Sequence, residues 1–94
     1  MTTPAAPPER ESLIEYPSDF PIKVMGRVAP DMLESLVRVV REHDPQFDPA
    51  TVEIRPSKAG NYHGLTFVVR ATSREQLDAL YRALHGHPMV AVVL

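Results

Sequence analysis

The sequence predicts an α+β protein with a ferredoxin-like fold, in which a four-stranded antiparallel sheet carries two helices on one face. Two patterns lead to this expectation. Apolar and polar residues alternate in several short segments, as they do in half-buried strands, and apolar residues recur at helical spacing in two longer segments. These segments follow one another in the order β-α-β-β-α-β. Right-handed crossovers in that order place both helices on the same face of a single sheet.

The first strand is expected over residues 22–28, where the apolar residues fall on one side and polar ones mainly on the other. The better-buried side carries Ile22, Val24 and Val28. Pro30 suits the first position of a helix, because its missing N–H is not needed there. An apolar stripe at helical spacing carries this helix to about His43 and consists of Leu33, Leu36, Val37 and Val40.

Two further strands lie in the middle of the chain. Val52 and Ile54 alternate with polar neighbours in a short second strand. The turn-rich segment 56–61 then leads into a third strand. On the core side of this third strand we expect Leu65, Phe67 and Val69.

The second helix has a clear start signal. Two pairs of residues have the spacing of a capping box: Thr72 with Glu75, and Ser73 with Gln76. The apolar stripe of this helix consists of Leu77, Leu80, Tyr81 and Leu84. Gly86 suits the left-handed position that ends many helices. Residues 89–94 then form a last, apolar strand.

Length and composition limit the classes of function. The 94 residues suffice for one domain, which we expect over residues 13–94 after a disordered, Pro-rich tail at residues 1–12. With 10 Lys and Arg against 12 Asp and Glu, the net charge is −2, whereas dedicated nucleic-acid binders are usually basic. No apolar run approaches the roughly 20 residues of a membrane span, and no secretion signal is present. A cytoplasmic protein that does not bind membranes is therefore expected.

Four strings of residues are similar to the YbeD-like family of small bacterial proteins. They are Tyr16-Pro-Ser-Asp-Phe-Pro-Ile-Lys-Val-Met-Gly26, Ser57-Lys-Ala-Gly-Asn-Tyr-His63, Glu75-Gln-Leu-Asp-Ala-Leu-Tyr81 and Val93-Leu94. The resemblance runs from about Leu13 to the C-terminus and implies a ferredoxin-like fold similar to ACT regulatory domains. Some members are labelled lipoate regulatory proteins because of their neighbouring genes. The resemblance therefore implies a regulatory role, with a link to lipoate metabolism.

The resemblance does not extend to a conventional amino-acid site. ACT domains that bind amino acids use a glycine-bearing turn directly before their first helix. Here three residues separate Gly26 from Pro30, so that pattern is not reproduced. Gly26 instead indicates a bulge or a close backbone contact.

No group of residues points to catalysis. The chain has no Cys, and its Ser residues lack a nucleophile-elbow setting or a local His and carboxylate arrangement. His85 and His87 have a spacing that could share a metal ion, but no third ligand is identifiable. We therefore expect no enzyme, no metal site and no cofactor.

Residues 57–63 are the candidate ligand site. Gly60 beside Asn61 allows the chain to reverse while Lys58 and backbone amides point outward, where they could hold a phosphate or carboxylate. The candidate ligand-binding residues are Lys58, Gly60, Asn61, Tyr62 and His63. The alternative is a β-hairpin loop whose polar residues only cap the strands.

The sheet face opposite the helices is the candidate protein interface. Alternation places Met25, Val68 and Val93 on this face, where apolar side chains would otherwise meet water. Scattered exposed apolar residues are the alternative explanation. RRM domains bind RNA on the same face through outward aromatic residues. In this chain Phe67 falls on the core side, and only Tyr62 could face outward.

Taken together, these patterns favour a non-enzymatic regulatory or adaptor domain that acts through protein–protein contacts. Two alternatives stay open: a sensor of a small anionic metabolite at residues 57–63, and an RRM-like RNA-binding module, with nucleic acid the less favoured partner. The two open edges of a four-stranded sheet also favour a homodimer, paired edge to edge rather than face to face.

Overall fold

The two longest strands form the centre of the sheet. A computed structural model describes residues 15–94, in which β1 (Ser18–Arg27) and β3 (Tyr62–Ala71) each span 10 residues. The two strands pair antiparallel over their full length, from Ser18 opposite Ala71 to Arg27 opposite Tyr62. Both strands begin earlier than the alternating pattern predicts. In the part that the pattern does cover, every second side chain is buried.

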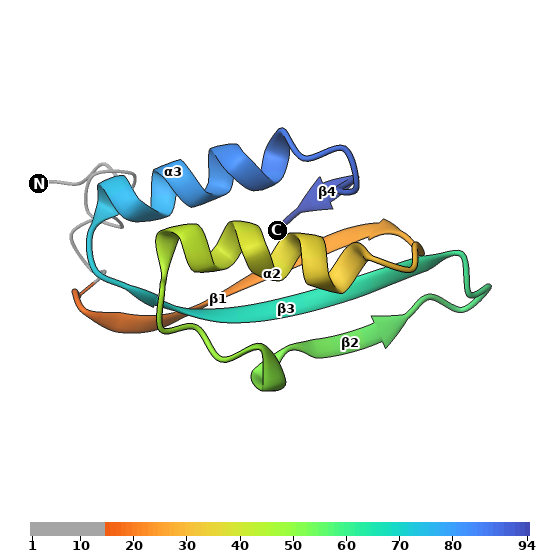
Figure 1. Cartoon of the computed structure of the whole chain (residues 1–94), viewed down its shortest axis with the longest axis horizontal. Coiled ribbons are helices and arrows are strands. Elements are labelled where there is room, and N and C mark those ends of the chain that lie inside the picture. The colour runs from red at the N-terminus through yellow and green to blue at the C-terminus, as the bar shows by residue number, and fades with distance from the viewer. Residues whose placement is uncertain (1–14) are drawn as a thin grey trace, which may run out of the picture.

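Short strands flank this central pair, and two helices cover one side of the sheet. β2 (Glu53–Pro56) pairs with β3 and β4 (Val92–Val93) pairs with β1, which gives the order β2-β3-β1-β4. A short 3-10 helix, η1 (Pro49–Thr51), precedes β2. The helices α2 (Met32–His43) and α3 (Arg74–His85) lie on the same face of the sheet (Figure 1). The predicted ferredoxin-like fold is confirmed, whereas the predicted tail at residues 1–12 lies outside the described residues.

The hydrophobic core lies between the sheet and the two helices. Phe67 is fully buried at its centre, with its ring centroid 5.8 Å from that of Phe47. Other core residues come from the strands (Ile22, Val24, Leu65, Val69, Ala71) and from the helices (Met32, Leu36, Val40, Leu77, Leu80, Leu84). The predicted core side of the third strand is confirmed. Phe47 joins the core from the loop after α2, where no periodic pattern marks it.

Two side chains predicted to face the core are exposed. The end of one strand and the edge position of another explain this difference. Val28 is exposed because β1 ends at Arg27, so Val28 already belongs to the following loop. Ile54 stands opposite the buried Leu65 and so points to the helix side of the sheet. It is nevertheless exposed, because β2 lies at the sheet edge, beyond the two helices (Figure 1).

The last strand is shorter than predicted and its faces are reversed. A turn in which the N–H of Val90 donates to the carbonyl of His87 delays the strand to Val92–Val93. Val93 stands opposite the buried Val24 and packs against the core, so its predicted outward position was wrong. Val92 faces outward in its place. The alternation could not reveal this, because every residue from 89 to 94 is apolar.

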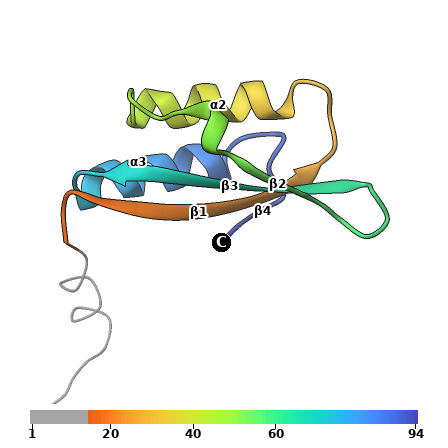
Figure 2. The same ribbon diagram turned by 90° about the horizontal axis from the view of Figure 1, so that it is seen from below.

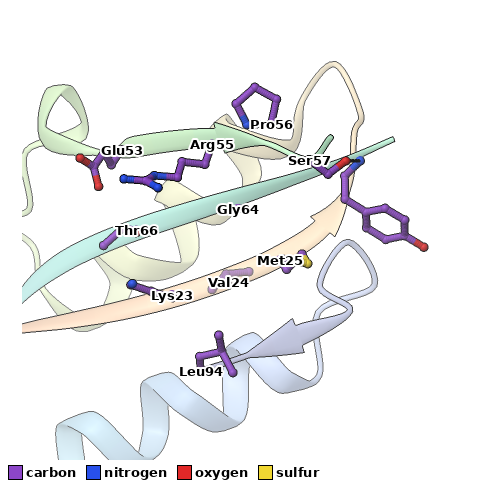
Figure 3. A pocket seen from close by; sticks show the side chains of 11 residues that line it. Lys23, Val24, Met25, Glu53, Arg55, Pro56, Ser57, Gly64, Thr66 and Leu94 are labelled. Atoms are coloured by element: carbon purple, nitrogen blue, oxygen red, sulfur yellow. Dashed lines mark hydrogen bonds between the residues drawn. The ribbon is translucent and has the colours of Figure 1, made fainter. Parts of the chain in front are cut away.

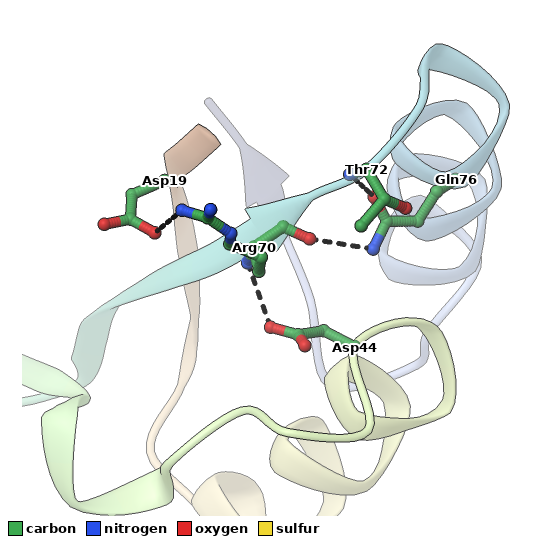
Figure 4. A network of polar contacts seen from close by, with 5 residues as sticks. All are labelled: Asp19, Asp44, Arg70, Thr72 and Gln76. Carbon is green, nitrogen blue, oxygen red and sulfur yellow. Dashed lines mark hydrogen bonds and ion pairs between the residues drawn. The ribbon is translucent and has the colours of Figure 1, made fainter. Parts of the chain in front are cut away.

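Two side chains close the free edge of β3 on the side where β2 has not yet begun, beyond the pairing of Glu53 with Thr66. The N–H of Arg70 donates to Oδ2 of the buried Asp44 at 2.9 Å (Figure 4). Gln76 Nε2 donates to the carbonyl of Arg70 at 3.0 Å and to that of His43 at 2.8 Å. Gln76 Oε1 accepts from the N–H of Thr72 at 2.6 Å. The end of α2, the end of β3 and the start of α3 are thereby joined.

The cap predicted at the start of α3 is confirmed, whereas the backbone conformation predicted at its end is not. Of the two predicted capping pairs, Ser73 and Gln76 form one, because Ser73 Oγ accepts from the N–H of Gln76 at 3.0 Å. Gly86 has φ −86°, so the predicted left-handed position was wrong. Its N–H instead bonds to the carbonyl of Arg82 at 3.0 Å, which continues the right-handed turn.

The central ring provides a test of the core. We expect Phe67→Ala to lower the free energy of unfolding by about 3–5 kcal/mol, because it removes a fully buried ring. Val68→Ala, at the exposed neighbouring position, should change it by less than about 0.5 kcal/mol. Urea denaturation measures both values. Equal losses in the two variants would contradict the assignment of faces in β3.

The Gln76 side chain provides a second test. Gln76→Ala should lower the free energy of unfolding by about 1–3 kcal/mol, because it leaves backbone groups of three elements without their partner. Arg82→Ala, on the exposed side of the same helix, is the control and should be close to neutral. Amide hydrogen exchange at Thr72 should also become faster in Gln76→Ala. Unchanged exchange there would show that the side chain does not hold this corner.

Candidate functional site

The sheet face opposite the helices is open to solvent (Figure 2). Antiparallel partners that stand directly opposite each other share a face, so the register arranges the outward side chains in rows across the sheet. One row contains Lys23, Thr66 and Glu53, and the next contains Met25, Gly64 and Arg55. Strands are about 4.8 Å apart, so the side chains of one row are close neighbours.

A hollow of about 330 Å³ lies over Gly64 in the middle of this face (Figure 3). We call it the Gly64 hollow. Gly64 contributes no side chain, whereas its neighbours in the surrounding rows do. The hollow has a polar part, formed by Lys23, Glu53, Arg55 and Thr66, and an apolar part, formed by Met25 and Leu94.

Two cations and one carboxylate determine the charge of the Gly64 hollow. Within residues 15–94, neither Lys23 nor Arg55 forms an ion pair or a side-chain hydrogen bond. Arg55 extends along β2 toward Glu53 (Figure 3). One row further along, the guanidinium of Arg27 lies 5.6 Å from the ring centroid of Tyr62. The side chains of the lining therefore have one positive charge in excess, with a further cation close by.

Exposed apolar side chains accompany these charges on the open face. Met25 is 42% exposed, Val68 43% and Val92 46%. The predicted exposure of Met25 and Val68 is thus confirmed, and Val92 replaces Val93. The charged residues of this face are four cations (Lys23, Arg27, Arg55, Arg70) and two carboxylates (Asp19, Glu53), a net charge of +2 in a chain whose own net charge is −2.

The predicted ligand loop at residues 57–63 is the turn of the β2–β3 hairpin. Gly60 has φ +82°, as expected for a chain reversal. Three of its backbone N–H groups are used within the hairpin: that of Gly60 bonds to the carbonyl of Ser57, that of Ser57 to the carbonyl of Tyr62, and that of Tyr62 to Ser57 Oγ. The carbonyl of Asn61 accepts from Val28. Lys58 is exposed.

The side chains of the last two residues of that loop point to opposite faces of the sheet. Tyr62 stands opposite Arg27 on the open face, whereas His63 stands opposite the buried Gly26 and therefore points to the helix side. Of the candidate ligand-binding residues, only Tyr62 lines the Gly64 hollow, together with Ser57 from the same loop. The signal that the sequence analysis missed is Gly64 itself, a glycine inside a strand.

Gly26 shows the close backbone contact that the sequence predicts. A β-carbon at this position would collide with the carbonyl oxygen of Met89 and lie 2.9 Å from Cε of Met32. The end of β1 is thus in direct contact with the turn before β4. Beyond that turn, the N–H of Leu94 donates to the carbonyl of Lys23 at 2.7 Å, which positions Leu94 at the hollow.

The edge of β1 beyond β4 is protected against pairing with another strand. The backbone N–H and carbonyl of Lys23 both bond to Leu94, so these groups point toward the β4 side. Because backbone direction alternates along a strand, Pro21 directs its nitrogen to the same side, where β4 no longer pairs with β1. Proline has no N–H, so this edge lacks a donor at Pro21.

The outer edge of β2 has a similar feature. Arg70 directs its N–H away from β1, so Gly64 and Thr66, which have the same parity, direct theirs toward β2. Their partners are Arg55 and Glu53, which leaves Pro56 facing the outer edge. Proline again removes a donor there.

Other candidate chemistry lies away from the open face. The ring Nδ1 of His87 accepts from the N–H of Met89 at 3.1 Å. Burial raises the pKa of Tyr81 on α3, in the helix layer. Within residues 15–94, no three acidic, His or Cys side chains are grouped so as to hold a metal ion. No helix in that range has the length and apolar character needed to span a membrane.

Comparisons with known proteins identify a matching family model and several similar proteins. A family model described as "Protein of unknown function (DUF493)" matches residues 11–94. A UPF0250 protein of Bordetella parapertussis is 74% identical over 88 residues, which cover 94% of this chain and 96% of that protein. A UPF0250 protein of Ralstonia nicotianae is 67% identical over 92 residues, which cover 98% and 94% respectively.

Among solved structures, the ACT domain of a GTP pyrophosphokinase from Chlorobium tepidum is similar to this chain. The TM-score is 0.55 at 18% sequence identity, and the match covers 82% of this chain and 97% of that domain. At this identity the likeness shows the fold alone.

Two glycines inside strands provide a matched test of whether packing requires a glycine at each position. Gly26→Ala should lower the free energy of unfolding by about 1–3 kcal/mol, because the methyl group collides with the backbone of Met89. Gly64→Ala meets only the carbonyl oxygen of Arg55, at 3.7 Å, and should raise the free energy of unfolding by up to about 1 kcal/mol. Thermal denaturation of the two variants distinguishes these outcomes. Similar losses in both would mean that Gly64 is required by packing.

Proposed function

The chain belongs to the family of small bacterial proteins of unknown function described as DUF493, and we propose that it is a non-enzymatic regulatory domain that binds another protein through its open sheet face. One observation carries this proposal: three apolar side chains, Met25, Val68 and Val92, are each more than two-fifths exposed on a sheet face that no helix within residues 15–94 covers. The link to lipoate metabolism and the cytoplasmic location stay predictions.

The exposed apolar residues support a protein contact because they lie on three neighbouring strands. Val92 stands opposite Met25, and Val68 stands opposite Pro21 on the same face. The row of Lys23, Thr66 and Glu53 lies between these two apolar pairs. Apolar side chains exposed together with polar ones on one face are typical of a site that another protein covers.

The charge of the open face favours an acidic partner over a second copy of this chain. The face has a net charge of +2, so two copies stacked face to face would bring like charges together. A partner that presents carboxylates to this face would complement Lys23, Arg27 and Arg55. The acidic residues of the rest of the chain lie outside this face, so they do not contact such a partner there.

The sheet edges also argue against the edge-paired homodimer that the sequence favours. Pro21 and Pro56 each remove a donor from one open edge, so an added strand would find an interrupted ladder of hydrogen bonds. A homodimer stays a prediction, and the proposed interface is the face rather than an edge.

A matched pair of variants tests this interface. Val68→Glu replaces an exposed apolar side chain of the open face by a carboxylate, and Val28→Glu makes the same change in the β1–α2 loop, where the valine is equally exposed at 43%. We expect Val68→Glu to reduce binding of a partner isolated with the wild-type chain at least tenfold, while Val28→Glu retains it. Calorimetry with the purified partner measures the loss, and rising salt should weaken the wild-type complex.

Equal binding by the two variants would refute the open face as the interface. Light scattering over a range of concentrations gives an independent readout. A mass of two chains that returns to one chain in Val68→Glu would identify the partner as a second copy and overturn the argument from charge. A dimer that persists in Val68→Glu would place self-association at an edge.

A further inference from the structure

Gly64 is a glycine without a local structural reason. Among residues 15–94, only Gly60 has a positive φ, so the backbone of Gly64 adopts a conformation open to any residue. The nearest heavy atom to an added β-carbon is the carbonyl oxygen of Arg55 at 3.7 Å, an ordinary contact. A glycine within a strand costs stability relative to a residue with a side chain. What the missing side chain leaves behind is the Gly64 hollow.

The position of Gly64 makes this hollow a cradle rather than a gap at the margin. Gly64 lies between Met25 and Arg55 across the sheet, and Thr66 follows it on the same face of β3. Its floor is therefore backbone of the central strands, and its walls are side chains from β1, β2 and β3 and from Leu94, which follows β4. A volume of about 330 Å³ is at the lower end of the range for small-molecule sites.

The walls offer two kinds of contact on different sides. Lys23 and Arg55 are cations that lack an ion-pair partner within residues 15–94, and Thr66 adds a hydroxyl group. Met25 and Leu94 offer apolar surface on the β1 and β4 side (Figure 3). A ligand that satisfies both has an anionic end and an apolar body.

We propose that the Gly64 hollow binds a small monocarboxylate with an apolar chain. The carboxylate lies between Lys23 and Arg55, and the chain packs over Gly64 against Met25 and Leu94. Among the side chains of the lining, Glu53 leaves only one positive charge in excess, which suits a single carboxylate better than a phosphate dianion. This site goes beyond the proposed function, because ligand binding here requires no protein partner.

Amide NMR titration of the full chain with hexanoate tests the site. We expect saturable shifts at Gly64, Thr66 and Lys23. Hexylammonium and hexanol, which share the chain but lack the negative charge, should give weaker shifts that do not saturate over the same range. A hexanoate response no stronger than that of hexanol would show that the cations play no part.

Variants of the hollow separate a built site from non-specific binding. Gly64→Val fills the cradle with a β-branched side chain that favours strands, so it should reduce hexanoate affinity at least tenfold without lowering the melting temperature. Arg55→Gln should weaken binding about fivefold, as expected for the loss of a partly exposed charge. Arg38→Gln, which removes an exposed cation from α2, should leave affinity unchanged.

Retention of wild-type affinity in Gly64→Val would overturn the proposal, as would equal effects of Arg55→Gln and Arg38→Gln. These outcomes are distinguishable from failure of the protein interface, because the titration contains no partner. Conversely, Val68 does not line the hollow. Val68→Glu can therefore abolish partner binding while hexanoate still binds, and the two proposals succeed or fail separately.

Discussion

The arrangement of this protein depends on how the free edge of β3 is closed at Arg70, beyond the first residue of β2. Asp44 and Gln76 satisfy the backbone of Arg70 there, and Gln76 also bonds to the carbonyl of His43. Since α2 ends at His43 and α3 begins at Arg74, one corner holds both helices against the same face. Backbone groups left unpaired in this half-buried place would be costly, so the corner has little freedom to rearrange.

With both helices on one side, the other face of the sheet stays available for binding. The prolines at positions 21 and 56 interrupt the two edges, so the face is the more suitable surface for a partner. The open face has a net positive charge although the chain as a whole is acidic, and this favours an acidic partner. The fold and the charge therefore both favour the open sheet face, which neither helix covers, as the surface of the proposed interaction.

Two glycines in the central strands show how the same residue type serves different purposes. Gly26 is required because the carbonyl of Met89 occupies the space of a side chain, and this contact fixes the turn that leads to β4. Gly64 has room for a β-carbon, so its lack of a side chain shapes the surface instead. Packing explains the first glycine, whereas the proposed ligand site accounts for the second.

The order of elements, the core side of β3 and the Ser73 cap could be predicted from the sequence, because periodicity and capping act over a few neighbouring residues. The face of Val93, the exposure of Ile54 and the Gly64 hollow could not. Residues 89–94 are uniformly apolar, so only pairing with β1 decides which side each one faces. Ile54 has the right parity but lies beyond the reach of the helices. The hollow needs Lys23 from β1, Arg55 from β2 and Leu94 from just beyond β4, and only the register of the folded sheet brings them together.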